Sequence, residues 1–230
     1  MLDVRALDAF YGDFQALRGV SFSLMKGDIT AIIGANGAGK TTLLRAISGV
    51  LSQKSGEIRL DGRSILTARG EQVARAGIAM VPEGRLLYPS LTVEENLLMG
   101  TAARRTGAWT LGAVYDLFPV LPELRRLGGT TISGGQQQMV AIGRALLSNP
   151  TVLLCDEISL GLSPKVVSEI YDCFQRLIAA GLSIVIVEQD VRRALSVASH
   201  VHCLLEGRIS LSSPSATVAF DDISRAYFGS

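Results

Sequence analysis

The stretch Gly34-Ala35-Asn36-Gly37-Ala38-Gly39-Lys40-Thr41 decides the fold, because it combines a glycine, four residues and then Gly-Lys-Thr. This pattern is typical of a loop that binds phosphate groups. Its glycines let consecutive backbone N–H groups point at phosphate oxygens, and the N-terminus of the next helix adds a partial positive charge. Such a loop lies between a strand and a helix, and the sequence predicts both, in the apolar run Ile29–Ile33 and the helical pattern of about Lys40–Ser48.

The polar side chains of this stretch predict a nucleotide phosphate chain and Mg²⁺ as ligands. Lys40 would neutralise the β and γ phosphates, and the hydroxyl of Thr41 would reach Mg²⁺. A glycine turn without a ligand is the alternative, and the strand and helix around the loop favour binding. The residues of this segment that we expect at the nucleotide are Gly34, Asn36, Gly37, Ala38, Gly39, Lys40, Thr41 and Thr42.

Charge and hydropathy exclude several classes of protein. The 230 residues carry 22 lysines and arginines against 21 aspartates and glutamates, so a formal net charge of +1 predicts no nucleic-acid partner. The mean hydropathy of +0.33 requires either a membrane span or unusually buried strands. Apolar runs such as Val152–Cys155 and Ile184–Val187 are much shorter than the roughly 20 residues that cross a membrane. Buried parallel strands are therefore expected.

The N-terminus and the cysteines predict a cytoplasmic location. Met1 is followed by Asp3, without the cationic start and apolar segment of a secretory signal. Cys155, Cys173 and Cys203 are odd in number and widely spaced, which fits neither a disulfide framework nor a zinc site. We expect all three to be buried thiols.

Three kinds of segment predict the organisation of the chain. Leu2–Ala6 and Val20–Leu24 alternate as strands of an antiparallel meander. From Ser90 to about Asn149 the pattern is helical, and it opens with Thr92-Val93-Glu94-Glu95, a capping box. The apolar runs on either side are strands of a parallel sheet. We expect one α/β domain over residues 1–230, with a helical insert at about 84–150.

A second site signal follows the buried strand Thr151–Cys155, which ends in Asp156 and Glu157. Ligands bind at the carboxyl ends of the strands in open parallel sheets. Asp156 is predicted to hold Mg²⁺, and Glu157 to orient or deprotonate the water that attacks the γ-phosphate. A solvated loop after the strand is the alternative, which the phosphate-binding loop makes much weaker.

The run Ser133-Gly134-Gly135-Gln136 at the start of a helix is a possible second anion site, although alone it would be an ordinary helix cap. The phosphate-binding loop, this run and the Asp-Glu pair, in that order, resemble the ATP-binding cassette family over nearly the whole chain. The resemblance implies a P-loop NTPase fold with a mainly parallel core sheet, an antiparallel β subdomain and an inserted α-helical subdomain. In that family two cassettes pack head to tail, so Ser133, Gly135 and Gln136 are implied to contact ATP bound by the partner.

The same resemblance assigns two positions at the nucleotide. Tyr11, in Tyr11-Gly12, is similar to the aromatic residue that stacks on adenine, with a core tyrosine as the alternative. Glu83 occupies the place of a glutamine that senses the γ-phosphate and touches the membrane subunits. Glu83 is therefore implied to contact both nucleotide and Mg²⁺.

The resemblance also assigns a loop and one further residue near the site of hydrolysis. The loop Ser159-Leu160-Gly161-Leu162-Ser163 resembles the one that crosses the dimer interface. By the same resemblance, Gln189 occupies the place of the switch histidine of the family. The catalytic candidates are therefore Glu157 and Lys40, from their motifs, and Gln189, from the resemblance. His200 and His202 are expected to flank a surface strand.

Longer strings are similar to one branch of the family, the second ATPase of branched-chain amino-acid importers. They are Val81-Pro82-Glu83-Gly84-Arg85, Leu91-Thr92-Val93-Glu94-Glu95-Asn96-Leu97, Ala141-Ile142-Gly143-Arg144-Ala145-Leu146 and Val187-Glu188-Gln189. The close relative that serves urea import is the main competing interpretation, and Ser133-Gly134-Gly135-Gln136-Gln137-Gln138 suits it slightly. Ile158 and Ile132 replace the usual proline and leucine, and Ile158 is expected to relax the backbone beside Glu157.

The resemblance implies a subunit that hydrolyses ATP to drive import. Its implied partners are a second, nonidentical ATPase, two membrane permease subunits and, indirectly, a soluble substrate-binding protein, with no nucleic acid. It would be cytoplasmic, peripheral on the inner face of the cell membrane. The alternatives are a urea or amide importer, a cassette protein acting on ribosomes or DNA, and a phosphate-loop kinase.

Overall fold

The predicted parallel core is the larger of two sheets. The computed structural model describes residues 1–228. The core sheet is built from β3 (Ile29–Ile33), β6 (Ile78–Val81), β7 (Val152–Asp156), β8 (Ser183–Glu188), β9 (His200–Leu205) and β10 (Arg208–Pro214). Its order is β10-β9-β3-β8-β7-β6, with β10 antiparallel to β9 and the other neighbours parallel. The mainly parallel core sheet is thus confirmed.

The second sheet is antiparallel and comes from the first part of the chain. Its strands are β1 (Leu2–Tyr11), β2 (Phe14–Leu24), β4 (Lys54–Leu60) and β5 (Arg63–Ser64). They lie in the order β2-β1-β4-β5, and each neighbour runs antiparallel to the next. This confirms the predicted antiparallel region.

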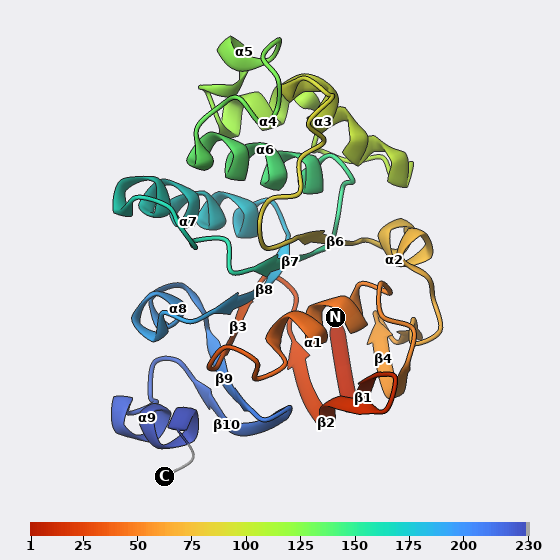
Figure 1. Ribbon diagram of the computed structural model, residues 1–230, viewed down its shortest axis with the longest axis vertical. Coiled ribbons are helices and arrows are strands. Elements are labelled where there is room, and N and C mark those ends of the chain that lie inside the picture. Colours follow the sequence, from red (N-terminus) through yellow and green to blue (C-terminus); the bar gives the residue numbers. More distant parts are fainter. Residues whose placement is uncertain (229–230) are drawn as a thin grey trace.

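Helix α1 (Lys40–Ile47) packs between the two sheets (Figure 1). Leu43 and Leu44 of α1 are fully buried in one apolar cluster with Leu7 of β1 and Ile32 of β3. Ile33 belongs to a second cluster on the other face of the core sheet, because successive side chains of a strand point to opposite faces. The helix that begins at Lys40 is therefore fixed from both sides.

The second cluster is covered by the helices of the C-terminal half. These are α7 (Pro164–Ala179), α8 (Val191–Val197) and α9 (Phe220–Phe228), while α2 (Gly70–Ala76) precedes β6. Phe174 of α7 and Ile223 of α9 are buried in this layer. The buried and free state of the cysteines is confirmed for Cys155, Cys173 and Cys203.

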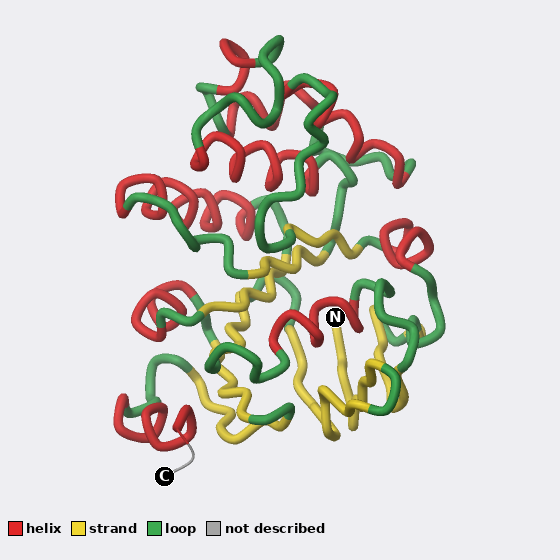
Figure 2. The backbone as a smooth tube through the Cα atoms, in the orientation of Figure 1, coloured by secondary structure: helices red, strands yellow, loops and turns green. Residues whose placement is uncertain are grey.

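The helical insert lies at one end of the molecule (Figure 2), where its helix α6 packs against β6 at the edge of the core sheet. Between β6 and β7 the chain forms α3 (Val93–Leu98), the 3-10 helix η1 (Met99–Ala103), α4 (Leu111–Leu117), α5 (Leu121–Leu124) and α6 (Gly134–Leu146). Thr92 and Glu95 form the predicted capping box of α3. The bounds 84–150 and the single domain over 1–230 stay predictions. Within residues 1–228 the structure holds no helix with both the length and the apolarity of a membrane span.

The prediction that His200 and His202 flank a surface strand is wrong. Both lie within β9, which has β3 on one side and β10 on the other. His202 is 5% exposed, and its ring lies 5.7 Å from that of Phe22. Neither of its ring nitrogens has a hydrogen-bond partner among the described residues. Burial, with a smaller effect of His200, lowers the pKa of His202 from 6.5 to about 4.

His202 should make the protein sensitive to acid. Between pH 6.5 and about 4 the unfolded chain binds a proton at this residue and the folded chain does not, so the free energy of unfolding falls as the pH falls. The full difference corresponds to about 3 kcal/mol. Replacing His202 with Leu should remove this loss. The measurement is urea unfolding from pH 7 to pH 4 for wild type, His202→Leu and the exposed control His200→Leu. An equal pH dependence of all three proteins would contradict the assignment.

Candidate functional site

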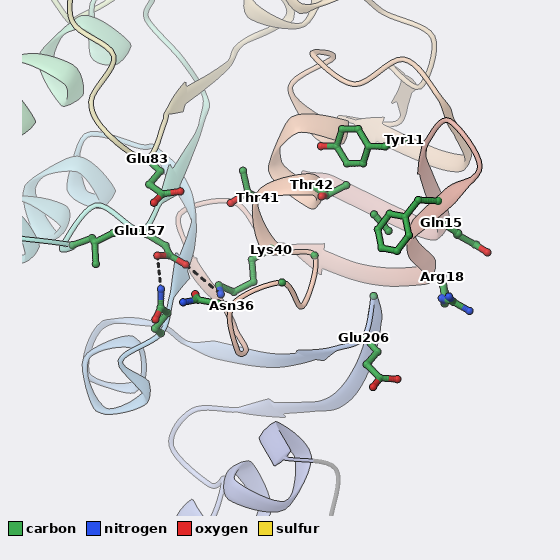
Figure 3. A pocket seen from close by; sticks show the side chains of 17 residues that line it. Tyr11, Gln15, Arg18, Asn36, Lys40, Thr41, Thr42, Glu83, Glu157 and Glu206 are labelled. Atoms are coloured by element: carbon green, nitrogen blue, oxygen red, sulfur yellow. Dashed lines mark hydrogen bonds and ion pairs between the residues drawn. The ribbon is translucent and has the colours of Figure 1, made fainter.

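A pocket of about 870 Å³ lies where the loops after β3, β7 and β8 meet the turn between β1 and β2 (Figure 3). The carboxyl ends of parallel strands meet at one edge of a sheet, which brings residues distant in sequence together. Predicted site residues that line the pocket are Tyr11, Asn36, Gly37, Gly39, Lys40, Thr41, Thr42, Glu83, Glu157 and Gln189. Gly34, Ala38 and Asp156 lie buried behind this surface.

Glycine is required at three positions of the phosphate-binding loop, for two different structural reasons. Gly37 and Gly39 have φ angles of 81° and 109°, in the left-handed region that favours glycine. Gly34 is needed for a different reason, since a Cβ there would lie 2.3 Å from the carbonyl oxygen of Leu204. The end of β9 therefore supports the loop directly.

Lys40 lies at the centre of the site and contacts both the phosphate-binding loop and Glu157. Its side chain is 3% exposed, and its ammonium nitrogen donates to the carbonyl oxygens of Gly34 at 2.8 Å and Ala35 at 3.0 Å. The same nitrogen lies 3.2 Å from Oε1 of Glu157, as the dashed line in Figure 3 shows. The phosphate-binding loop and the end of β7 are thus joined by one buried ion pair.

Gln189 holds the other oxygen of the same carboxylate. Its amide nitrogen donates to Oε2 of Glu157 at 2.6 Å. The backbone N–H of Glu157 donates to the carbonyl oxygen of Val187 at 3.0 Å. The structure therefore brings together the three residues predicted as catalytic, and it adds a backbone contact that fixes the turn bearing Glu157.

Asp156 lies beside Thr41 and is 1% exposed. The Thr41 hydroxyl donates to Oδ1 of Asp156 at 3.2 Å, whereas Oδ2 has no hydrogen-bond partner among the described residues. Burial raises the pKa of Asp156 to about 6, the hydrogen bond from Thr41 opposes this, and the charges of Glu157 and Glu83 add to it. A buried oxygen without a partner beside a hydroxyl fits Mg²⁺, which prefers oxygen ligands.

The backbone of Glu157 has a φ angle of 45°, which is unusual for a residue other than glycine. Ile158 follows it and is 2% exposed in the core. The left-handed turn thus forms with isoleucine where the family usually has proline. That Ile158 relaxes the backbone beside Glu157 stays a prediction.

Tyr11 ends β1 and is 41% exposed at the pocket, which argues against the alternative of a core tyrosine. Stacking of its ring on adenine stays a prediction. Phe14, which is 67% exposed, lies across the turn between β1 and β2 and lines the same pocket. Two aromatic rings are therefore available at this end of the cavity.

The run Ser133-Gly134-Gly135-Gln136 does not line this pocket. Ser133 caps α6, and its backbone N–H donates to the side chain of Gln136 at 2.9 Å in a capping box. A Cβ on Gly135 would lie 2.6 Å from Cγ1 of Val166, so packing against α7 requires glycine at this position. The placement fits a run that serves a partner's nucleotide, and that role stays a prediction.

Sequence reasoning missed several residues that line the pocket. They are Phe14, Gln15, Ala16, Arg18, Leu160, Glu206 and Gly207. Leu160 had been assigned only to the dimer interface, while the others come from β2 and from the turn between β9 and β10, which carry no motif. A Cβ on Gly207 would lie 2.4 Å from the carbonyl oxygen of Ala16, a close approach that short patterns cannot reveal.

Comparison with known proteins identifies the family. The family model described as "ABC transporter" matches residues 17–159. The chain belongs to the ABC transporter family. It is 40% identical to the high-affinity branched-chain amino acid transport ATP-binding protein BraG of Pseudomonas aeruginosa, over 100% of both chains. It is 35% identical to the probable branched-chain amino acid transport ATP-binding protein LivF of Archaeoglobus fulgidus, over 92% of this chain and 91% of that protein.

The structural comparison agrees. A crystal structure of the ADP conformation of an ATP-binding cassette of an ABC transporter matches with a TM-score of 0.82 and 26% identity, covering 100% of this chain and 99% of that one. The predicted family and P-loop NTPase fold are confirmed. The chain is an ATP-binding cassette. Subunits of this class bind ATP and hydrolyse it to power ABC transporters. ATPases of ABC importers work with membrane permease subunits.

The close approach at Gly34 generates a prediction. Gly34→Ala should force β9 and the loop apart, lowering the free energy of unfolding by about 1 to 3 kcal/mol and weakening ATP binding. The control is Gly112→Ala in α4, where the nearest atom to a Cβ lies at 3.7 Å and alanine favours the helix. Thermal unfolding and ATP titration of both variants give the answer. Wild-type values for Gly34→Ala would contradict the packing argument.

Proposed function

We propose that this cassette hydrolyses ATP as a subunit of an importer for branched-chain amino acids. The observation that carries the proposal is the carboxylate of Glu157, held by Lys40 at 3.2 Å and Gln189 at 2.6 Å above the phosphate-binding loop. The likeness to BraG over the full length of both chains supports the substrate class. The proposed place of action is the inner face of the cell membrane.

The loop residues would bind the phosphate chain. Backbone N–H groups of residues 36–41 bind the phosphate oxygens, and the N-terminus of α1 adds its partial positive charge. Phosphate oxygens compete with Glu157 for the ammonium group of Lys40. When Lys40 moves to the phosphates, Glu157 loses its ion pair, and its Oε1 becomes available to accept a hydrogen bond from the attacking water.

The remaining site residues hold the metal and the water. Thr41 and Asp156 would hold Mg²⁺, with Glu83 on the same side of the site, and the ion would neutralise charge on the phosphates. Glu157 then orients or deprotonates the attacking water. Gln189 keeps Oε2 of Glu157 in place by its amide N–H, in the position where the family has a histidine. Tyr11 stacks on the adenine ring.

The proposed assembly contains a nonidentical second ATPase and two permease subunits, with a soluble substrate-binding protein acting through the permeases. Ser133, Gly135 and Gln136 lie outside the pocket of their own chain. This supports a nucleotide site that is completed by the corresponding run of the second ATPase. In the other half of the assembly, these residues would receive the γ-phosphate bound by the second ATPase.

The general base is tested by Glu157→Gln, which keeps the size of the side chain and removes its charge. Hydrolysis in the complete assembly should fall about a hundredfold or more. ATP affinity should be kept or increased, because Lys40 no longer pairs with a carboxylate. Turnover and equilibrium ATP binding are measured beside Glu169→Gln, an exposed control on α7. Turnover at the wild-type rate would refute the assignment of Glu157.

The shared site is tested by ATPase assays of this chain alone and with the second ATPase and permeases. Activity should be weak alone and rise on assembly. Ser133→Arg should then impair the site whose phosphate-binding loop belongs to the second ATPase, because it places a cation where the γ-phosphate enters. Thr110→Arg is the matched control, since Thr110 caps α4 in the insert. Full activity of the isolated chain, unaffected by Ser133→Arg, would overturn the proposal.

A further inference from the structure

Glu188 is a buried carboxylate that the proposed mechanism does not use. It is the last residue of β8 and is 2% exposed. Burial raises its pKa, and the nearby charge of Glu157 acts in the same direction. A buried charge is costly unless hydrogen bonds or an opposite charge compensate it. Glu188 therefore needs partners, and their positions indicate what it does.

Both oxygens of Glu188 accept hydrogen bonds. The hydroxyl of Tyr171 on α7 donates to Oε1, and the hydroxyl of Ser159 donates to Oε2 at 3.0 Å. The guanidinium of Arg193 on α8 lies 6.0 Å from the centre of the Tyr171 ring, and its charge favours the ionised form of Glu188. The carboxylate is thus held between α7, α8 and the loop that follows β7.

The loop partner, Ser159, lies only two residues after the proposed general base. Gln189, the neighbour of Glu188, donates to Glu157, while Glu188 accepts from Ser159. Consecutive residues at the end of β8 therefore hold both ends of the short turn from Glu157 to Ser159. The hydrogen bond from the Glu157 N–H to Val187 lies between the same two segments.

The turn needs such support, because Glu157 adopts a left-handed backbone conformation that residues other than glycine rarely keep unless the surroundings impose it. Gln189 holds the carboxylate of Glu157 through a single hydrogen bond to one oxygen. A backbone shift at Ser159 would move Glu157 relative to the phosphate-binding loop. Displacements of about 1 Å at a reacting group are enough to reduce turnover strongly.

We propose that Glu188 is a positioning residue for ATP hydrolysis, which forms with Ser159 and Tyr171 a buried clasp that fixes the turn bearing Glu157. The proposal rests on the proposed function of Glu157. In the clasp, Glu188 acts through the backbone of the turn and does not touch the nucleotide, since it lies outside the residues that line the pocket. ATP binding and ATP turnover should therefore respond differently when the clasp is broken.

The test compares Glu188→Ala and Glu188→Gln in the complete assembly of both ATPases and the permeases. Glu188→Ala should lower kcat about tenfold and leave the Kd for ATP within about twofold of wild type. Glu188→Gln should recover most of the rate, because an amide oxygen still accepts from Tyr171 and the amide N–H can donate to Ser159. Cys173→Ala, a truncation of another buried side chain of α7, is the control for loss of packing and should keep kcat.

The single hydroxyl variants keep the test decisive if Glu188→Ala folds poorly. Ser159→Ala and Tyr171→Phe should each lower kcat by less than Glu188→Ala does. Combining either with Glu188→Ala should give no further loss, because residues of one network are not additive.

The outcomes separate this inference from the proposed function. If the wild-type assembly hydrolyses ATP and Glu188→Ala keeps the wild-type kcat, the clasp is refuted while the function stands. If Glu188→Ala, folded to the wild-type extent, loses kcat and ATP affinity together and Glu188→Gln does not recover either, the positioning role is also refuted. A wild-type assembly that cannot hydrolyse ATP would instead refute the proposed function.

Discussion

Lys40 carries a positive charge into a pocket wall where its side chain is only 3% exposed, so its partners must come from the protein or from a ligand. In the structure those partners are two carbonyl oxygens of the phosphate-binding loop and the carboxylate of Glu157. Phosphate oxygens would satisfy the same ammonium group. Binding of the phosphate chain and release of Glu157 are therefore two sides of one competition, and the proposed general base is freed only when the substrate has entered.

The fold makes this competition possible by bringing separate segments to one edge of the core sheet. The loop after β3 leads to Lys40 at the start of α1. Strand β7 ends at Asp156 and is followed by Glu157, and Gln189 directly follows β8. Helix α1 is packed between the two sheets, which fixes the backbone of Lys40 at its first turn and leaves only the side chain to change partners. Glu188, the last residue of β8, precedes Gln189. Its hydrogen bonds connect the turn that bears Glu157 to helix α7.

The sequence predicted the local chemistry well, because motifs carry it within a few residues. Residues of the phosphate-binding loop, Glu157 and Gln189 line one pocket, and Asp156 lies behind it, hydrogen-bonded to Thr41. Contacts between distant backbone segments were not predictable. The carbonyl oxygen of Leu204 lies close to Gly34, and that of Ala16 lies close to Gly207. Backbone atoms are the same in every residue, so such contacts produce no sequence motif. The burial of His202 was not predicted, because it depends on the pairing of β9 with β3 and β10. That pairing joins segments that are distant in the sequence. The hydrogen bonds of Glu188 likewise join residues 17 and 29 positions apart.

The central claim is that Lys40 exchanges Glu157 for the phosphate chain. It is tested most directly by a structure of the assembled ATPase pair with a nonhydrolysable ATP analogue and Mg²⁺, in which the distance from Nζ of Lys40 to the carboxylate of Glu157 is measured. The account predicts that Lys40 contacts β and γ phosphate oxygens, and that its distance to Glu157 is clearly longer than the present 3.2 Å. An analogue bound in the pocket with the Lys40–Glu157 ion pair still intact would contradict it.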